Sequence, residues 1–350
     1  MTLQWQLIVS GEHIDPAAPL FYDCEFVQNG AYHNELALLQ LYQPQWPAVQ
    51  LIPYRRNLDW AFMAQQQGPL VIHSATSDLD LMWYYGRVMP ARLHDTQLGY
   101  QLLHRQRPPS YKNMVKEYLG INLDKELRES PWLQRPLSEA QQRYAAADVY
   151  YLSQLYPLLV AQLKEKGRLH WWEEEGQRLM AARRQSRFHW FNLSGSTQLM
   201  AQPAAQVIAH ILTEARERVA AAQNVLRTRL LSDREIIAVA MAAPRSVVEM
   251  LDALPVGSPV VKAELDFIID NFNCRHGLQI PFIHRPLAMN KAQHKRCREI
   301  EHYRNRIARE LGIQPHIFGN YLDIQYFVLN PEDSLLGQGW RREFFSQFIN

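Results

Sequence analysis

Two short stretches of the sequence carry acids in an arrangement suited to metal chemistry. Asp23 and Glu25 lie two residues apart in the apolar run LFYDCEFV (20–27), so both side chains would leave one face of a strand. Tyr144 and Asp148, in YAAADVYYL, would lie one turn apart on one face of a helix. Neighbouring carboxylates in a mostly buried strand repel one another and lose hydration, and a divalent cation would relieve both costs. An Asp-x-Glu pair alone is common without a metal, so the inference requires further acids that converge on the same point.

Of three more aspartates after the predicted strands, one is a candidate for such a cluster. Asp78 follows the predicted strand PLVIHS (69–74) and lies near the start of a predicted helix. An Asp in a first turn is also favourable for the helix dipole, so a purely structural role stays open. We expect Asp80, on a different face, to be solvated, and Asp95, in LHDTQL, to cap the next helix.

The elements that must position these acids follow from the hydrophobic pattern. Apolar runs bounded by turns predict strands at 20–27, 36–43, 48–54 and 69–74. After residue 77 the pattern becomes helical, with helices predicted near 78–86, 95–105 and 111–119. Strands followed by helices on a sheet indicate an α/β domain.

The helix that carries Tyr144 and Asp148 has a clear start. Ser138 and Gln141 form an S-x-x-Q capping box, so the helix should begin near Glu139. We expect Pro157 to kink or end it. The three alanines between the tyrosine and the aspartate either leave room for a substrate or pack tightly against the sheet.

The second half of the chain reads as helical. The segment 186–203 contains Gly and Ser and is predicted to be a linker. Helical patterns at 204–228, 233–242 and 246–254 precede a break at PVGSP (255–259), and another helical group runs from about 285 to 350. We therefore predict an α/β domain at 1–185 and two small all-helical domains at 204–280 and 285–350.

Composition limits the class of protein. Of the 350 residues, 47% are hydrophobic and 21% are charged, as in ordinary globular proteins. We find no membrane-spanning run and no secretory signal, and three scattered cysteines suggest a reducing compartment, so we expect a cytoplasmic protein. Residues 1–100 carry 4 Lys and Arg against 9 Asp and Glu, and residues 101–200 carry 15 against 10. This uneven distribution of charge fits a carboxylate site beside a surface that binds a polyanion. Ordinary scatter of charged residues along the chain is the alternative.

Taken in order, these motifs resemble the DEDD exonuclease superfamily in its tyrosine-bearing branch, and the ribonuclease D family most of all. The matching stretches are DCEFV (23–27), HSATSDL (73–79), HDTQ (94–97) and YAAADVYYL (144–152). Between the last two lie LDK, a tryptophan and RPLS, all within residues 123–138. The resemblance implies a ribonuclease H-like exonuclease domain with a mixed β-sheet. It also implies 3′→5′ hydrolysis of nucleic acid with two divalent metal ions, Mg²⁺ or Mn²⁺.

The resemblance assigns a role to each site residue. Asp23 is expected to bridge both metals, Glu25 and Asp148 to hold the metal that activates water, and Asp78 to hold the second metal. Tyr144 would orient the attacking water, because a phenol with a pKa near 10 is a poor base at neutral pH.

Two positions outside the metal site bear on RNA binding. Lys125 either contacts a phosphate or is a solvated lysine. The loop after the first strand has Gln28 and Asn29 where relatives often have a basic residue. How this loop would bind RNA is therefore left open.

The helical tail resembles two HRDC domains, although Leu226 stands where the family has a proline. The stretch KAQHKRCREIEHYRNRIAR (291–309) has seven Lys and Arg against two Glu. Lys295, Arg296 and Arg298 are our candidates for RNA contacts, with a solvated amphipathic helix as the alternative. The resemblance implies an exoribonuclease that trims 3′ ends of tRNA precursors and other small structured RNAs and releases 5′-nucleoside monophosphates. The sequence leaves the oligomeric state open, and we expect a monomer. A 3′→5′ DNA exonuclease and a non-catalytic RNA-binding or scaffold protein are the alternatives.

Overall fold

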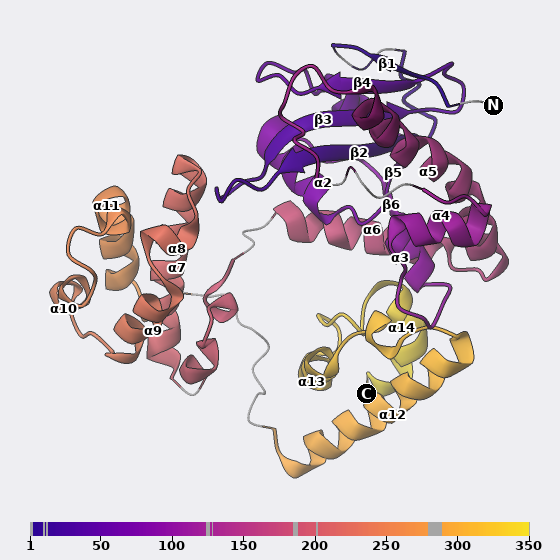
Figure 1. Ribbon diagram of the computed structural model, residues 1–350. Coiled ribbons are helices and arrows are strands. Elements are labelled where there is room, and N and C mark those ends of the chain that lie inside the picture. The colour runs from indigo at the N-terminus through magenta and orange to yellow at the C-terminus, as the bar shows by residue number, and fades with distance from the viewer. Residues whose placement is uncertain are drawn as a thin grey trace. The chain divides into compact units, whose positions relative to one another are not determined.

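The chain folds into two compact units (Figure 1). A computed structural model describes residues 3–9, 11, 13–123, 127, 129–184, 188–200, 202–278 and 289–349. One unit contains residues 1–27, 35–184 and 286–350, and the other contains residues 28–34 and 185–285. None of the helices within these described ranges is long and apolar enough to cross a membrane.

A mixed sheet is the centre of the first unit. Six strands form it within the described residues, in the order β1-β4-β3-β2-β5-β6. Their bounds are β1 (Trp5–Leu7), β2 (Leu20–Val27), β3 (Glu35–Tyr42), β4 (Val49–Pro53), β5 (Leu70–Ile72) and β6 (Leu93–Asp95). β3 pairs antiparallel with β2 and β4, whereas β1–β4, β2–β5 and β5–β6 are parallel. The predicted α/β class is confirmed. β1 and β6 were missed because each has only three residues and, unlike β5, neither is a continuous apolar run.

Helices cover this sheet. They are α1 (Ala61–Gln65), α2 (Thr76–Leu81) with a π-helical turn (Met82–Gly86), α3 (Thr96–Gln101), α4 (Tyr111–Leu119), α5 (Glu139–Glu165) and α6 (Leu169–Arg184). The predicted capping box is confirmed, since Ser138 accepts a hydrogen bond from the Gln141 amide and α5 begins at Glu139. Of the two outcomes expected for Pro157, a kink or an end of the helix, the second is wrong, because packing of α5 across β2, β3 and β4 carries it on to Glu165.

The C-terminal helices belong to the same compact unit as the sheet. They are α12 (Lys291–Leu311), a 3₁₀ turn (Pro315–Ile317), α13 (Tyr321–Leu329), α14 (Gly339–Phe345) and a second 3₁₀ turn (Ser346–Phe348). The rings of Trp171 on α6 and Trp340 on α14 stack with centroids 4.2 Å apart. A buried ion pair of 2.5 Å joins Arg341 to Glu175. The described part of 285–350 is therefore packed against the nuclease core, although we had expected a separate domain.

The second unit is helical. Its elements are a 3₁₀ turn (Trp190–Asn192), another (Ser196–Leu199), α7 (Pro203–Gln223), α8 (Arg227–Leu230), α9 (Asp233–Met241), α10 (Val247–Asp252) and α11 (Pro259–Asn273). The prediction of a linker at 186–203 is wrong for its described residues, because Trp190, Leu193 and Leu199 are buried in this unit's core. We also missed α11, which starts at Pro259, where a proline favours a helix start as well as a break.

Candidate active site

The two acidic stretches singled out in the sequence converge in the first unit. One carboxylate oxygen each from Asp23, Glu25 and Asp148 lies within 4.8 Å of the other two, close enough for one cation to bind all three. β2 supplies the first two side chains on one face of the sheet, and α5, which packs across that face, supplies the third. All three are partly buried.

The electrostatics of this cluster favour a cation. Burial, followed by the negative charges of Asp78, Asp148 and Glu25, raises the pKa of Asp23 well above its usual range. Burial raises the pKa of Asp148 from 3.8 to about 7. Carboxylates whose ionised form is disfavoured by their surroundings gain most from a bound cation, which neutralises the repulsion. The residues present therefore suit a divalent metal.

Asp78 lies next to this cluster but is not one of the three converging acids. It is 5% exposed on α2, and its Oδ1 accepts a hydrogen bond of 3.1 Å from the Cys24 thiol. Burial raises the pKa of Asp78 to about 7, against hydrogen bonds from Cys24 that lower it. The negative charge of Asp78 also raises the pKa of Asp23. Asp78 is thus close enough to influence the cluster while it is bonded to a thiol that the sequence had not suggested.

Aromatic hydroxyls surround the helix that carries Asp148. Tyr144 lies one turn before it on α5, partly buried, with its ring 5.9 Å from that of Trp132. Tyr111 on α4 donates a hydrogen bond to the backbone carbonyl of Asp148. Burial, followed by the charges of Asp148 and Asp23, raises the pKa of Tyr111. We missed Tyr111 because nothing in its local sequence indicates a partner 37 residues away.

The other acids have structural roles. As predicted, Asp95 caps α3 by accepting a hydrogen bond from the Gln97 amide. Asp80 is partly buried and lies 3.9 Å from Arg183 on α6, so the expectation that it is solvated is wrong.

The candidate RNA-contacting residues have different surroundings. Lys125 lies outside the described residues. Lys295 and Arg298 are exposed on α12. Arg296 is partly buried, donates to the Phe348 carbonyl at 2.8 Å and lies over the Phe348 ring. The Arg296 guanidinium therefore joins α12 to the C-terminal 3₁₀ turn.

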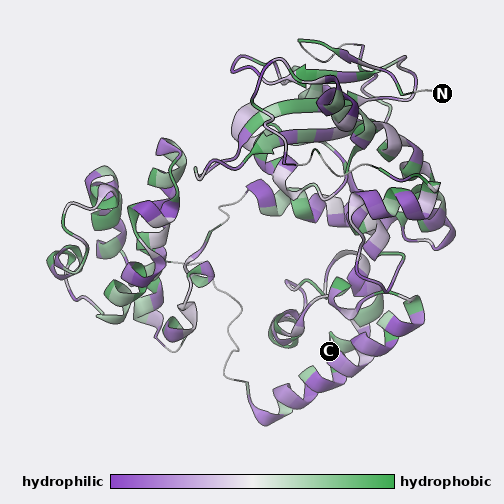
Figure 2. Ribbon diagram, in the orientation of Figure 1, coloured by the Kyte–Doolittle hydropathy of each residue, from purple (hydrophilic) through white to green (hydrophobic). Residues whose placement is uncertain are grey.

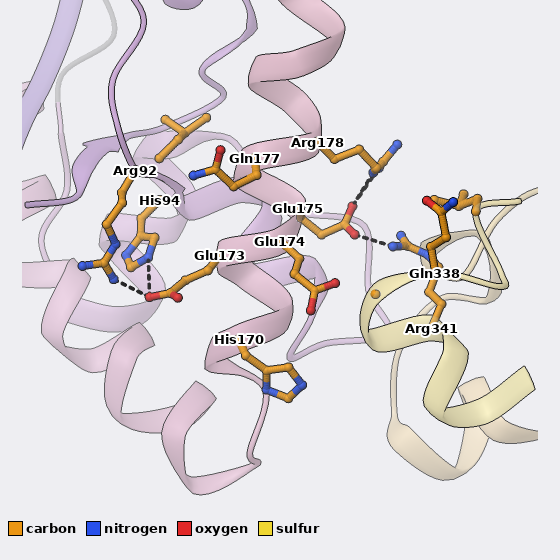
Figure 3. A pocket seen from close by; sticks show the side chains of 13 residues that line it. Arg92, His94, His170, Glu173, Glu174, Glu175, Gln177, Arg178, Gln338 and Arg341 are labelled. Carbon is orange, nitrogen blue, oxygen red and sulfur yellow. Dashed lines mark hydrogen bonds and ion pairs between the residues drawn. The ribbon is translucent and has the colours of Figure 1, made fainter. Parts of the chain in front are cut away.

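A separate cavity of about 590 Å³ lies between α6 and the C-terminal helices (Figure 3). Glu173 pairs with Arg92, and Glu175 lies between Arg178 and Arg341. Several of its charged lining residues pair with one another, and its lining includes none of the acids of the cluster, so the cavity is distinct from that cluster.

Comparison with known proteins agrees with this site. Residues 12–164 match a family model described as a 3′-5′ exonuclease. A ribonuclease D of Shewanella sp. (strain ANA-3) is 32% identical over 66% of this chain and 61% of its own length. A ribonuclease D of Bartonella henselae is 26% identical over 93% of this chain and 82% of its own length.

The fold agrees as well. The crystal structure of Escherichia coli RNase D matches with a TM-score of 0.79 and 21% identity, over 99% of this chain and 98% of that one. The match to the Shewanella relative spans about three fifths of that protein's own length. The chain thus carries a match to a 3′-5′ exonuclease model that includes the converging acids, and it is similar to ribonuclease D in sequence and in fold.

Proposed function

We propose that this chain is a 3′→5′ exoribonuclease that removes nucleotides one at a time and releases 5′-nucleoside monophosphates. The observation that carries the proposal is the convergence of Asp23, Glu25 and Asp148 within 4.8 Å, beside a buried Asp78. Hydrolysis of a phosphodiester develops negative charge on the attacking, leaving and phosphoryl oxygens, and a site that binds cations can stabilise it. The match of residues 12–164 to a 3′-5′ exonuclease model supports the reaction class.

In this proposal the carboxylates hold two divalent ions, Mg²⁺ or Mn²⁺. Asp23 would hold both, Glu25 and Asp148 would hold one, and Asp78 would hold the other directly or through a water. When bound, such ions lower the pKa of a water and offset charge on the phosphate. Tyr144 would orient the attacking water through its hydroxyl, because a tyrosine is ordinarily a poor base at neutral pH.

The exposed face of α12 is the proposed path for RNA phosphates. Six cationic or titratable side chains recur at helical spacing and are all exposed: Lys291, Lys295, Arg298, His302, Arg306 and Arg309. Figure 2 shows how hydrophilic this helix is along its length. Lys295 and Arg306 lie 3.9 and 4.0 Å from glutamates one turn on, and such exposed pairs are weak enough to yield to phosphate. We therefore propose these six residues as the phosphate contacts. Arg296, a candidate from the sequence, is left out because its guanidinium is bonded to the C-terminal turn.

The substrates we propose are tRNA precursors and other small structured RNAs, bound by a monomer with HRDC-like helical domains. The E. coli relative is described as an exoribonuclease involved in structured RNA processing, which supports this substrate class. Lys125, which lies outside the described residues, stays in the proposal as a phosphate contact.

The first experiment is a gel time course on 5′-labelled RNA with an unpaired 3′ tail, with Mg²⁺, Mn²⁺ or EDTA. We expect a single-nucleotide ladder from the 3′ end that EDTA and Asp148→Asn abolish. A matched DNA competitor tests the DNA exonuclease alternative, which predicts that DNA competes as well as RNA. No ladder with either metal, from protein that still binds RNA, would support a binding protein and contradict the proposal.

The RNA path has its own test. Replacing Lys295 and Arg298 with alanine should raise KM for a long RNA and lower the slope of log affinity against log salt by about 1.4, near 0.7 per single-strand phosphate contact. The control removes Lys164 and Lys166, two exposed lysines at the end of α5, and so changes net charge equally. Equal effects of the two double variants would show that only net charge matters.

A further inference from the structure

Asp95 makes more hydrogen bonds than a helix cap needs. It is the last residue of β6, is 4% exposed, and carries a carboxylate that accepts three backbone amide protons. Oδ1 accepts from Gln97, the cap of α3, at 2.8 Å, and also from Ser74 at 3.0 Å. Oδ2 accepts from Ala75 at 2.9 Å. Two of the three bonds therefore hold the turn between β5 and α2 and have no part in capping α3.

That turn determines where Asp78 lies. Ser74 has a φ of 63°, a left-handed conformation that a residue with a Cβ adopts at a cost of about 1 kcal/mol. Ala75 is the N-cap of α2, and Asp78 lies in the first turn of that helix. Since the backbone of the turn leads directly into the residue that carries the carboxylate, a change in the turn would move Asp78.

Asp95 is itself fixed from two sides. It pairs with Ile72 in the parallel register of β5 and β6. Its backbone carbonyl accepts a hydrogen bond of 2.7 Å from the indole nitrogen of Trp172, which is fully buried on α6. A carboxylate held this firmly can fix a neighbouring turn without moving to accommodate it.

We propose that Asp95 is a positioning residue of the metal site, which holds the β5–α2 turn so that Asp78 stays beside Asp23. The inference rests on the proposed metal-dependent function. Asp95 touches neither substrate nor the three converging acids as a ligand; it acts through the amides of Ser74 and Ala75. Residues that orient ligands in this way typically contribute 10- to 100-fold to metal affinity or activity.

Two substitutions separate the bracing of the turn from the capping of α3. Asp95→Asn keeps an oxygen for Ser74 and Gln97 but turns an NH₂ group toward the Ala75 amide, so it loses one bond. Asp95→Ser can still cap α3, because serine is a good N-cap residue, but its short side chain loses both bonds to the turn. The control is Asp59→Asn, an exposed aspartate that accepts from the Ala61 amide at the start of α1.

The primary readout is Mn²⁺ binding to the full-length protein by calorimetry, without RNA. We expect Mn²⁺ affinity to fall about 10-fold in Asp95→Asn and toward 100-fold in Asp95→Ser, with Asp59→Asn unchanged. In RNA hydrolysis kcat should fall in the same order, while KM stays within about 2-fold, because the RNA path is untouched. Urea denaturation in EDTA shows whether each variant is folded at the assay temperature.

The possible outcomes are distinct. Folded Asp95→Ser that binds Mn²⁺ as tightly as the unmodified protein would overturn the inference. If Asp95→Ser is unfolded, the decision passes to Asp95→Asn, whose smaller change must still weaken Mn²⁺ binding. A failure of the proposed function looks different: the unmodified protein would fail to hydrolyse RNA with any metal, whatever its Mn²⁺ affinity.

Discussion

The acidic cluster should make the metal-free protein less stable at neutral pH, and Asp148→Asn should reverse part of this loss. Asparagine keeps the shape of the side chain and removes its charge. Burial raises the pKa of Asp148 from 3.8 to about 7. A carboxyl whose pKa is raised in the folded state contributes stability that is present below pH 3.8 and is lost as the pH rises through about 7.

The magnitude follows from the shift. About 3 pKa units at roughly 1.4 kcal/mol each give an upper limit near 4 kcal/mol. Asp148 is only partly buried, so water reaches it and reduces the penalty, and we expect about 2 kcal/mol. In EDTA at pH 8, Asp148→Asn should therefore be about 2 kcal/mol more stable than the unmodified protein, and the difference should be much smaller at pH 4.5.

The assay is urea denaturation followed by tryptophan fluorescence, in EDTA at both pH values and again with saturating Mn²⁺. Mn²⁺ should stabilise the unmodified protein at pH 8 and should have little effect on Asp148→Asn, which lacks a ligand. Glu139→Gln, an exposed acid on the same helix with 80% of its side chain accessible, is the control and should change stability by less than about 0.5 kcal/mol. An Asp148→Asn protein that is less stable at pH 8 in EDTA would refute the reasoning.

Three further predictions concern other groups. Tyr144→Phe should lower kcat about 10- to 100-fold in steady-state kinetics with KM unchanged, since only the orientation of water is lost; an unchanged kcat would remove the proposed role. Iodoacetamide should spare Cys24 in the native protein, because burial raises the pKa of its thiol, and peptide mass spectrometry should find the label on exposed Cys274 first. Arg341→Met should cost about 3 kcal/mol in urea denaturation, because it deprives buried Glu175 of its closest cation; a loss near zero would mean that the pair contributes little.

Much of the site could be predicted from the sequence because its geometry is local. A strand places residues two apart on one face, so Asp23 and Glu25 had to project together. A helix places residues four apart on one face, so Tyr144 and Asp148 had to be neighbours once the capping box set the start of α5. The order of these motifs along the chain was enough to indicate the similarity to ribonuclease D.

Only the tertiary structure decided which distant groups meet. Cys24 and Asp78 are 54 residues apart, Tyr111 and Asp148 are 37 apart, and Trp171 stacks on Trp340 from the far end of the chain. No periodicity links such positions, because their approach depends on how whole elements pack. The sequence by itself determined the acids, their shared faces and the helix that carries them. The fold decided that Asp78 is bonded to a thiol, that Asp95 holds the turn leading to it, and that the C-terminal helices pack on the nuclease, since each depends on burial and hydrogen bonds between distant segments.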